Sequence, residues 1–262
     1  MNYVIEIEGV SWRRGELQLL RDVNWQVRQG EHWALLGLNG SGKTTLLNMI
    51  NGYYWPTTGK ISVLNHRFGE VDLRELRQSI GWVSSSLQEK LYATDKTQHV
   101  VISGKFATIG LYDKPAEEDY FRARAFMRTL GCTHLWDRDY RTCSQGEKQK
   151  LLIARALMAD PQILILDEPC NGLDLFSRER LLDSIHDLTL QPNTPTLIYV
   201  THHTEEILTV FSHTLLLRRG EVFRQGDTVQ VMNSATLSSF FEAPVTVECH
   251  DRRYYVRLSG KE

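Results

Sequence analysis

The stretch Gly37–Thr44 constrains the fold of this chain more than any other part of its sequence. It reads GLNGSGKT and matches the pattern G-x-x-x-x-G-K-[ST] in full. An apolar run, His32–Leu36, precedes it, and helical periodicity over Thr44–Ile50 follows it. A strand, a glycine-rich turn and a helix in this order are typical of a loop whose backbone N–H groups surround phosphate oxygens.

Each residue type in this loop suits phosphate binding. Glycine lets the backbone turn its N–H groups inward, and the start of the following helix adds the positive end of its dipole. We expect Lys43 to reach the β- and γ-phosphates of a nucleotide and the Thr44 hydroxyl to ligate Mg²⁺. The residues predicted to contact the nucleotide are Gly37, Leu38, Asn39, Gly40, Ser41, Gly42, Lys43, Thr44 and Thr45.

A second apolar run, Ile163–Leu166, ends in two carboxylates, Asp167 and Glu168. Ligand sites of α/β sheets form at the carboxyl ends of the strands. Asp167 is predicted to hold Mg²⁺ through water, and Glu168 to polarise an attacking water as general base. By itself the pair is equally well interpreted as an ordinary strand end, but the phosphate loop in the same chain favours the chemical interpretation.

Short apolar runs alternate with helical segments and predict an α/β fold. The runs before the phosphate loop and before Asp167, and the run Thr196–Val200, are apolar almost throughout, as expected of parallel strands covered on both faces. Further strand-like runs are Tyr3–Ile7, Ile61–Val63, Ile80–Val83 and Thr214–Leu217. We therefore predict a phosphate-loop (P-loop) NTPase core with an antiparallel β section.

The domain organisation follows from where this alternation stops. Residues 86–155 lack convincing strands and are predicted to form a helical lobe inserted in a main domain that covers residues 1–235. A short hairpin is expected around Gly220–Gly226. Residues 236–262 alternate apolar and polar positions on both sides of His250–Arg253, which predicts a C-terminal β-hairpin tail.

Composition limits the compartment and the partners. The formal net charge of −2 gives no basic excess for nucleic acid, which disfavours that partner without excluding it. No secretory signal is evident at the start, and no apolar run reaches the roughly 18 residues of a spanning helix. The cysteines lack metal-ligand spacing and are interpreted as free thiols in a reducing cytoplasm. Any role at a membrane therefore requires a separate partner.

The stretch Cys143–Gln149, CSQGEKQ, indicates which class of ATPase this chain resembles. It resembles the signature motif of ATP-binding-cassette proteins, usually written L-S-G-G-Q, which precedes the two-carboxylate strand as it does here. By its residues alone, Ser144–Glu147 is a capping box that opens a helix, and a capped helix start is itself a phosphate site. Ser144 and Gly146 keep the motif. The residues that depart from it are Cys143, Gln145 and Glu147.

Two further stretches resemble the same family. Asn171–Asp174 looks like the D-loop, which crosses the dimer interface in the family. His202 looks like the switch histidine, which the resemblance places at the γ-phosphate, where it holds the attacking water with Glu168. A histidine at a strand end is often incidental, and the neighbouring His203 competes for the role. The resemblance covers about 235 residues.

The resemblance implies one ATP site per chain and a homodimer on ATP binding, in which each chain supplies its Ser144 helix start to the other chain's ATP. It implies an ATPase that uses ATP and Mg²⁺ as the ATP-binding subunit of a transporter with separate membrane-spanning chains. Such a subunit is cytoplasmic and lies on the inner face of the membrane through its partner. The alternative is a soluble cassette ATPase that acts on nucleic acid, a ribosome or a regulatory partner.

The sequence departs from the family at two further contacts. Arg14 stands where the family has an aromatic residue on adenine; its guanidinium plane can stack on a base, while Trp12 on the same strand face is the alternative. Ser85 stands where the family has a metal-ligating glutamine, so we predict Ser85 as a metal ligand, with Gln88 reaching back as the alternative. The serine run and the tail resemble a subgroup related to molybdate-associated and photorepair proteins.

Overall fold

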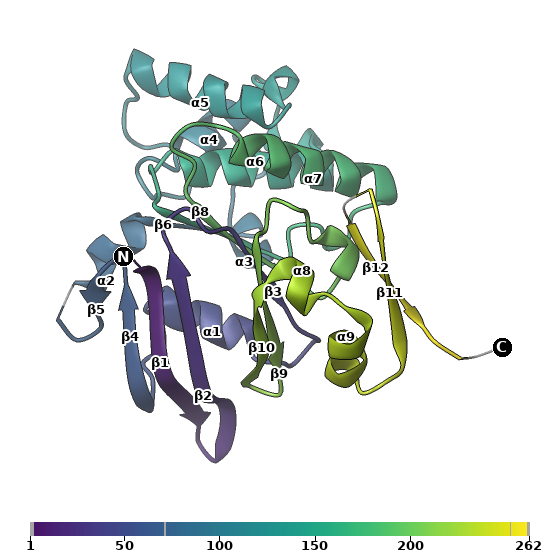
Figure 1. Cartoon of the computed structure of the whole chain (residues 1–262). Coiled ribbons are helices and arrows are strands. Elements are labelled where there is room, and N and C mark those ends of the chain that lie inside the picture. Colours follow the sequence, from purple (N-terminus) through teal and green to yellow (C-terminus); the bar gives the residue numbers. More distant parts are fainter. Residues whose placement is uncertain (1–2, 71, 252, 261–262) are drawn as a thin grey trace. The chain divides into compact units, whose positions relative to one another are not determined.

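The computed structural model describes residues 3–70, 72–251 and 253–260 (Figure 1). The chain divides into two compact units. Unit 1 comprises residues 1–77 and 196–262, and unit 2 comprises residues 78–195. Each unit has its own strands and its own buried apolar residues, so each is treated by itself below.

Unit 1 contains an antiparallel sheet with the strand order β2-β1-β4-β5. Its strands are β1 (Tyr3–Arg14), β2 (Leu17–Arg28), β4 (Thr58–Val63) and β5 (His66–Arg67). Along β2, Val23, Trp25 and Val27 are buried while the residues between them are exposed. This period of two is that of a strand with one covered face.

Unit 1 also contains the strands around the phosphate loop. The strand β3 (Trp33–Leu36) pairs in parallel with β8 (Thr196–Thr201) on one side and β9 (His213–Arg218) on the other. The strand β10 (Glu221–Asp227) pairs antiparallel with β9. All residues of β3 and β8 are buried, which explains their continuous apolar runs. Helix α1 (Lys43–Ile50) follows β3.

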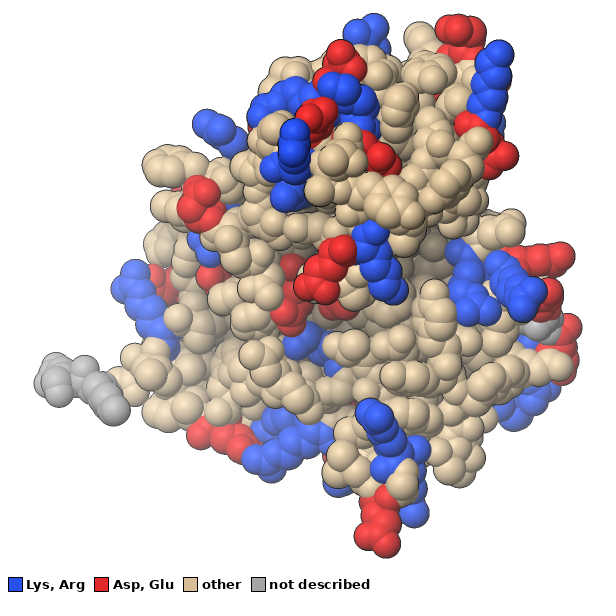
Figure 2. All heavy atoms as spheres, turned by 180° about the vertical axis from the view of Figure 1, so that it is seen from behind, with Lys and Arg blue, Asp and Glu red and all other residues tan. Residues whose placement is uncertain are grey.

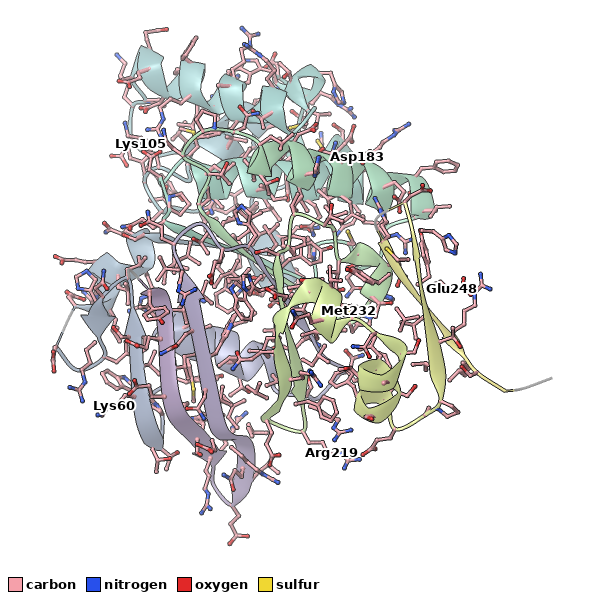
Figure 3. The ribbon with its side chains drawn as sticks, viewed as in Figure 1. Lys60, Lys105, Asp183, Arg219, Met232 and Glu248 are labelled. Atoms are coloured by element: carbon pink, nitrogen blue, oxygen red, sulfur yellow. The ribbon has the colours of Figure 1, made fainter. Side chains whose placement is uncertain are left out.

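The C-terminal part of unit 1 ends in a hairpin. Strands β11 (Val245–His250) and β12 (Arg253–Leu258) pair antiparallel, and β12 packs against the short turn η3 (Thr204–Glu206). Glu248, labelled in Figure 3, lies on β11 with a carboxylate oxygen 3.4 Å from Arg257 of β12. The remaining helices are α2 (Leu73–Gln78), which ends at the boundary of the unit, α8 (Thr228–Val231) and α9 (Ser234–Phe241).

Unit 2 is mainly helical. Its two strands, β6 (Ile80–Val83) and β7 (Ile163–Asp167), pair in parallel, and helices α4, α5, α6 and α7 pack against one another (Figure 1). The helical elements are α3 (Ser85–Gln88), α4 (Thr97–Ile102), α5 (Glu117–Thr129), η1 (Thr133–Leu135), η2 (Tyr140–Thr142), α6 (Gln145–Leu157) and α7 (Leu175–Thr189).

These elements confirm an α/β fold with an antiparallel β section and a helical insertion. Unit 2 is wider than residues 86–155, because β6, β7 and α7 cluster with the inserted helices. The cysteines are free thiols, three of them buried. Within the described ranges, no helix has both the length and the apolar character needed to cross a bilayer.

The close approach of α4 to α6 yields a stability prediction. A Cβ added at Gly104 would overlap the backbone oxygen of Arg155. The buried Arg155 guanidinium also donates to Thr108 O (2.9 Å), so this backbone has little room to move. We expect Gly104→Ala to lower the free energy of unfolding by about 1–3 kcal/mol, as overpacking does elsewhere. Urea denaturation measures this; an unchanged midpoint, equal to that of the exposed control Glu118→Ala, would contradict the packing described.

Candidate nucleotide site

The phosphate loop depends on glycine at positions where a side chain does not fit. The loop leaves β3 with Gly37, whose N–H donates to Thr201 O (3.2 Å). A Cβ on Gly37 would overlap Ser41 Oγ and lie 2.7 Å from Leu217 O. Gly42 has φ +106°, in the left-handed region, and its Cβ would lie 3.0 Å from Leu20 Cδ2. The loop conformation therefore requires the glycines of the motif.

The start of α1 is built to receive an anion. Its N-cap is Gly42, so no side chain accepts a hydrogen bond from the first turn, and that turn contains no acidic residue. Two long helices of unit 2 differ from α1 in this respect: Ser144 caps α6 and Asp174 caps α7 through side-chain oxygens. The first N–H groups of α1 are therefore left for an external acceptor, at the positive end of the helix dipole.

Two polar groups reinforce this interpretation. Lys43 is only 6% exposed, and its Nζ donates to Gly37 O (2.7 Å) and reaches Leu38 O (3.4 Å), which holds the ammonium against the loop. Among the described residues, Ser41 Oγ is a buried hydroxyl without a hydrogen-bond partner. A phosphate would supply acceptors for both groups, so the loop fits a phosphate-bearing ligand.

The two candidates for the adenine contact lie on β1. Trp12 stacks on Tyr54, with ring centroids 4.7 Å apart and an interplanar angle of 6°. Arg14 is the last residue of β1 and is exposed. Packing within unit 1 therefore occupies one face of the Trp12 ring, which favours Arg14 for the base contact; the role of Arg14 remains a prediction.

The segment that carries His202 is anchored by a residue that sequence reasoning missed. The buried Glu206 carboxylate accepts hydrogen bonds from Thr201 Oγ1 (2.6 Å) and Tyr199 OH (3.0 Å). Thr201 Oγ1 also accepts from His203 N (3.0 Å). Because Tyr199 and Thr201 belong to β8, these bonds tie the segment after the strand back to the strand itself. The sequence does not indicate which of the two adjacent acids, Glu205 or Glu206, is buried.

The two histidines that follow β8 differ in exposure and in their contacts. His203 is exposed, and its Nδ1 lies 3.6 Å from Glu205 Oε1. His202 is half-buried, and its ring packs against that of His203 with centroids 4.1 Å apart. The more enclosed His202 follows directly on the anchored end of β8, which favours it over His203 for a fixed contact.

In unit 2, the two carboxylates stand where β7 ends. Asp167 is the last residue of the strand, and both Asp167 and Glu168 are half-buried. Glu168 has φ +49°, a left-handed conformation that costs a non-glycine residue about 1–3 kcal/mol and is concentrated at functional sites. The backbone therefore turns sharply away from the strand at Glu168. The turn follows directly on Asp167, the acid for which a different role is predicted.

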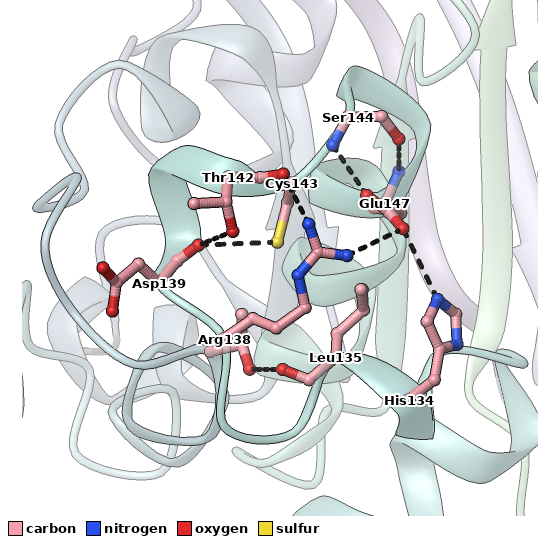
Figure 4. Close-up of polar contacts among 9 residues, drawn as sticks. His134, Leu135, Arg138, Asp139, Thr142, Cys143, Ser144 and Glu147 are labelled. Atoms are coloured by element: carbon pink, nitrogen blue, oxygen red, sulfur yellow. Dashed lines mark hydrogen bonds and ion pairs between the residues drawn. The ribbon is translucent and has the colours of Figure 1, made fainter.

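The signature stretch forms the capping box predicted from sequence (Figure 4). Ser144 Oγ accepts from Glu147 N (3.3 Å), and the Glu147 carboxylate accepts from Ser144 N (2.7 Å). Burial acts to raise the pKa of Glu147, but these bonds, with His134 (3.4 Å) and Arg138 (3.7 Å), hold it below its usual value. Glu147 is thus an anionic brace for the start of α6.

Gly146 packs the signature helix against α7. Its Cβ would lie 3.3 Å from Ser177 Cβ, a tighter contact than most Cβ atoms make. Asp174 of the D-loop-like stretch caps α7 by accepting from Ser177 N (3.0 Å) and Ser177 Oγ (2.7 Å), which lowers the pKa of Asp174. Unit 2 therefore brings the signature stretch and the D-loop-like stretch together.

The segment after β6 shows where Ser85 and Gln88 lie. Ser85 is exposed and begins α3. Gln88 forms a reciprocal pair of hydrogen bonds with Gln145, of 2.8 and 3.0 Å, and so contacts the first residue of α6. The amide of Gln88 is therefore held by the signature helix, and the metal-ligand role of Ser85 remains a prediction.

Comparison with known proteins identifies the family. The family described as ABC transporter matches residues 20–171. The ABC transporter ATP-binding protein YlmA of Bacillus subtilis, whose function is uncharacterised, is 49% identical over 245 residues, 93% of each chain.

Solved structures agree with this match. The chain resembles cbiO1 from Clostridium perfringens, part of the ABC transporter complex cbiONQ, with TM-score 0.78, 26% identity and coverage of 91% of this chain and 94% of that one. It also resembles the ATP-binding cassette MJ0796 in a dimeric post-hydrolysis state with ADP and Pi (TM-score 0.71, 26% identity, 85% and 98% coverage).

The phosphate loop, the two carboxylates and the capped signature helix thus occur on the fold of ATP-binding cassettes. The chain belongs to the ABC transporter family, as one of its ATP-binding, ATP-hydrolysing subunits.

Proposed function

We propose that this chain drives a transporter whose membrane-spanning subunits are separate chains, and that two copies of it share two ATP sites. The observation that carries the ATP site is the start of α1, where a buried lysine and uncapped N–H groups accompany a loop in which Gly37 and Gly42 leave no room for a side chain. Such a start binds phosphate through backbone and dipole together. The separate partner is inferred from the likeness to cbiO1, which is part of the ABC transporter complex cbiONQ.

The residues fit Mg²⁺ as the metal that accompanies ATP. The Thr44 hydroxyl is exposed in the first turn of α1, and the Asp167 carboxylate is half-exposed at the end of β7. Hydroxyl and carboxylate oxygens are the hard ligands that Mg²⁺ prefers, and Ser85 adds another hydroxyl. When bound, the metal neutralises charge on the phosphates. On this proposal, Thr44, Asp167 and Ser85 hold the metal directly or through water.

Hydrolysis is assigned to two side chains. Glu168 accepts a proton from the attacking water, since a carboxylate placed within reach of that water acts as general base. His202 holds the water and the γ-phosphate, and Glu206 keeps the segment of His202 anchored to β8.

The second copy supplies the start of α6. Ser144 is exposed at a helix start whose own brace, Glu147, is already engaged, while Gly146 is buried against Ser177 and allows the helix start to pack closely on α7. A phosphate of the other chain's ATP can therefore approach the backbone closely at this point. The dimeric structure of the cassette MJ0796 with ADP and Pi supports a working unit of two copies.

The face of the molecule that Figure 2 shows gives no support to the alternative, a cassette ATPase that acts on nucleic acid. On the face that Figure 2 shows, acidic and basic side chains are intermixed and form no single basic patch. Nucleic-acid binding requires clustered positive charge. We therefore propose a position on the cytoplasmic side of a membrane, reached through the partner. The resemblance to the molybdate-associated subgroup, and with it the cargo, stays a prediction.

Lys43→Ala tests the phosphate site. Removing the ammonium that is held against the loop should lower MgATP affinity by at least about 100-fold, because charge-assisted hydrogen bonds to phosphate are among the strongest available. Isothermal titration calorimetry measures this, with exposed Lys60→Ala of the same unit as matched control. Equal affinity in the two variants would contradict the assignment of the loop.

Ser85→Ala tests the metal assignment. If the hydroxyl helps to hold Mg²⁺, the concentration of Mg²⁺ that gives half-maximal ATPase activity should rise about three- to tenfold, the effect of one lost oxygen contact. The matched control is Ser86→Ala, the exposed neighbour whose Oγ instead contacts Ser84 Oγ (3.0 Å). A Mg²⁺ dependence unchanged from that of the control would remove Ser85 from the metal site.

A further inference from the structure

Three glutamine amides in unit 2 form a cluster between the segment after β6 and the signature helix. Gln88 Nε2 donates to Gln145 Oε1 (2.8 Å), and Gln145 Nε2 donates back to Gln88 Oε1 (3.0 Å). Gln149 Nε2 donates to the same Gln88 Oε1 at 3.3 Å. A single side chain of α3 is thus held by two side chains of α6.

The spacing on α6 makes this possible. Gln145 and Gln149 are four residues apart, so they lie on the same face of the helix, one turn above the other. Gln145 is exposed, Gln88 is half-buried and Gln149 is only 4% exposed. The cluster therefore runs from the surface into the interior of unit 2: the two Gln88–Gln145 bonds are exposed, and the Gln149–Gln88 bond is partly buried.

The inner end of the cluster depends on Gln88. Gln149 Oε1 is buried and has no hydrogen-bond partner among the described residues. The bond from Gln149 Nε2 to Gln88 therefore compensates part of the cost of burying this amide. If Gln88 moved away, Gln149 Nε2 would lose its bond to Gln88, in addition to the Oε1 that has no partner in the described part of the chain. The position of Gln88 is therefore coupled to the packing of α6.

The outer end of the cluster lies beside the capping box. Gln145 is the first residue of α6, next to Ser144, whose Oγ caps the helix. On the other side, Gln88 closes the short α3 that begins with Ser85. Both Gln145 and Ser85 are departures from the family pattern, which has glycine and glutamine at these positions. The amide pair joins Gln145 to the last residue of the short helix that begins with Ser85.

We propose that Gln88 is a positioning residue of the ATPase cycle, which couples the segment 84–89 to the start of α6 through its amide pair with Gln145. Displacement of the segment, by metal binding at Ser85 or by a partner subunit, then shifts Ser144 and Gly146. This inference rests on the proposed function, because it assigns Ser144 to the ATP of a second copy. In this proposal Gln88 acts through its contact with Gln145 and does not ligate the metal.

A double-mutant cycle tests the coupling. The variants are Gln88→Met and Gln145→Met, which keep side-chain length but remove the amide, their combination, and Gln88→Glu, which keeps an acceptor for both partners. The matched control is Gln98→Met in the same unit, whose amide contacts only Asp137 Oδ1 (3.4 Å) among the side-chain bonds described. Two quantities are measured for each: hydrogen exchange of the first turn of α6 without nucleotide, and kcat and KM for ATP.

Each single Met variant should lower kcat about fivefold and change KM by less than about twofold. The kcat of the double variant should be no lower than that of the single variants. Exchange at residues 145–148 should rise in Gln88→Met, while Gln88→Glu should retain at least about half of the turnover. Additive losses, or exchange and turnover in Gln88→Met equal to those of Gln98→Met, would overturn the proposal.

The exchange measurement separates this inference from the proposed function. It uses the chain without nucleotide, so it judges the amide pair whatever the outcome for the shared ATP site. Intact ATP binding in Lys43→Ala would contradict the proposed function alone. Unchanged exchange in Gln88→Met would contradict the coupling alone.

Discussion

The uncapped start of α1 is the constraint on which the rest of this structure depends. Backbone N–H groups at a helix start need acceptors, and Gly42 provides no side chain to accept their hydrogen bonds. Any side chain at Gly37 would collide with Ser41 and Leu217 O, so the loop keeps a conformation that only glycine allows. The strands β8 and β9 pair with β3 on both sides, and all four residues of β3 are buried, which gives this loop a rigid base. Phosphate satisfies the groups that the fold leaves without acceptors, and the family assignment agrees with that chemistry.

Much of this could be predicted from sequence because the relevant signals are local. Continuous apolar runs such as Ile163–Leu166 identify strands covered on both faces, and Ser144 with Glu147 identifies a helix start, since both depend on neighbours in the chain. The burial of Glu206 and the partners of Gln88 could not be predicted in this way. Glu206 is buried because Tyr199 and Thr201 return to it from β8, and Gln88 meets a residue 57 positions away. Such contacts are set by tertiary packing, which no periodicity in the sequence encodes.

In unit 2, residues that depart from the family pattern take part in specific polar contacts. A serine in place of the metal-ligating glutamine and a glutamine in place of a signature glycine would each weaken the expected pattern if taken alone. In the structure, Gln145 takes part in a reciprocal amide pair with Gln88, and Glu147 braces the same helix start from the other side, with Arg138 and His134 around it. The start of α6 is therefore held by two sets of polar contacts. These contacts fix the start of α6 within its own chain.

The oligomeric state of Glu168→Gln in MgATP tests the central claim, that two copies share the ATP sites, most directly. Glutamine keeps the shape of the side chain but cannot accept the proton of the attacking water, so bound ATP should persist. Size-exclusion chromatography with light scattering should show a dimer with MgATP and a monomer without it. Adding Ser144→Arg, which places a bulky cation at the start of α6, should return the variant to a monomer that still binds ATP. A Glu168→Gln chain that stays monomeric at saturating MgATP, or a double variant that still dimerises, would contradict the shared site.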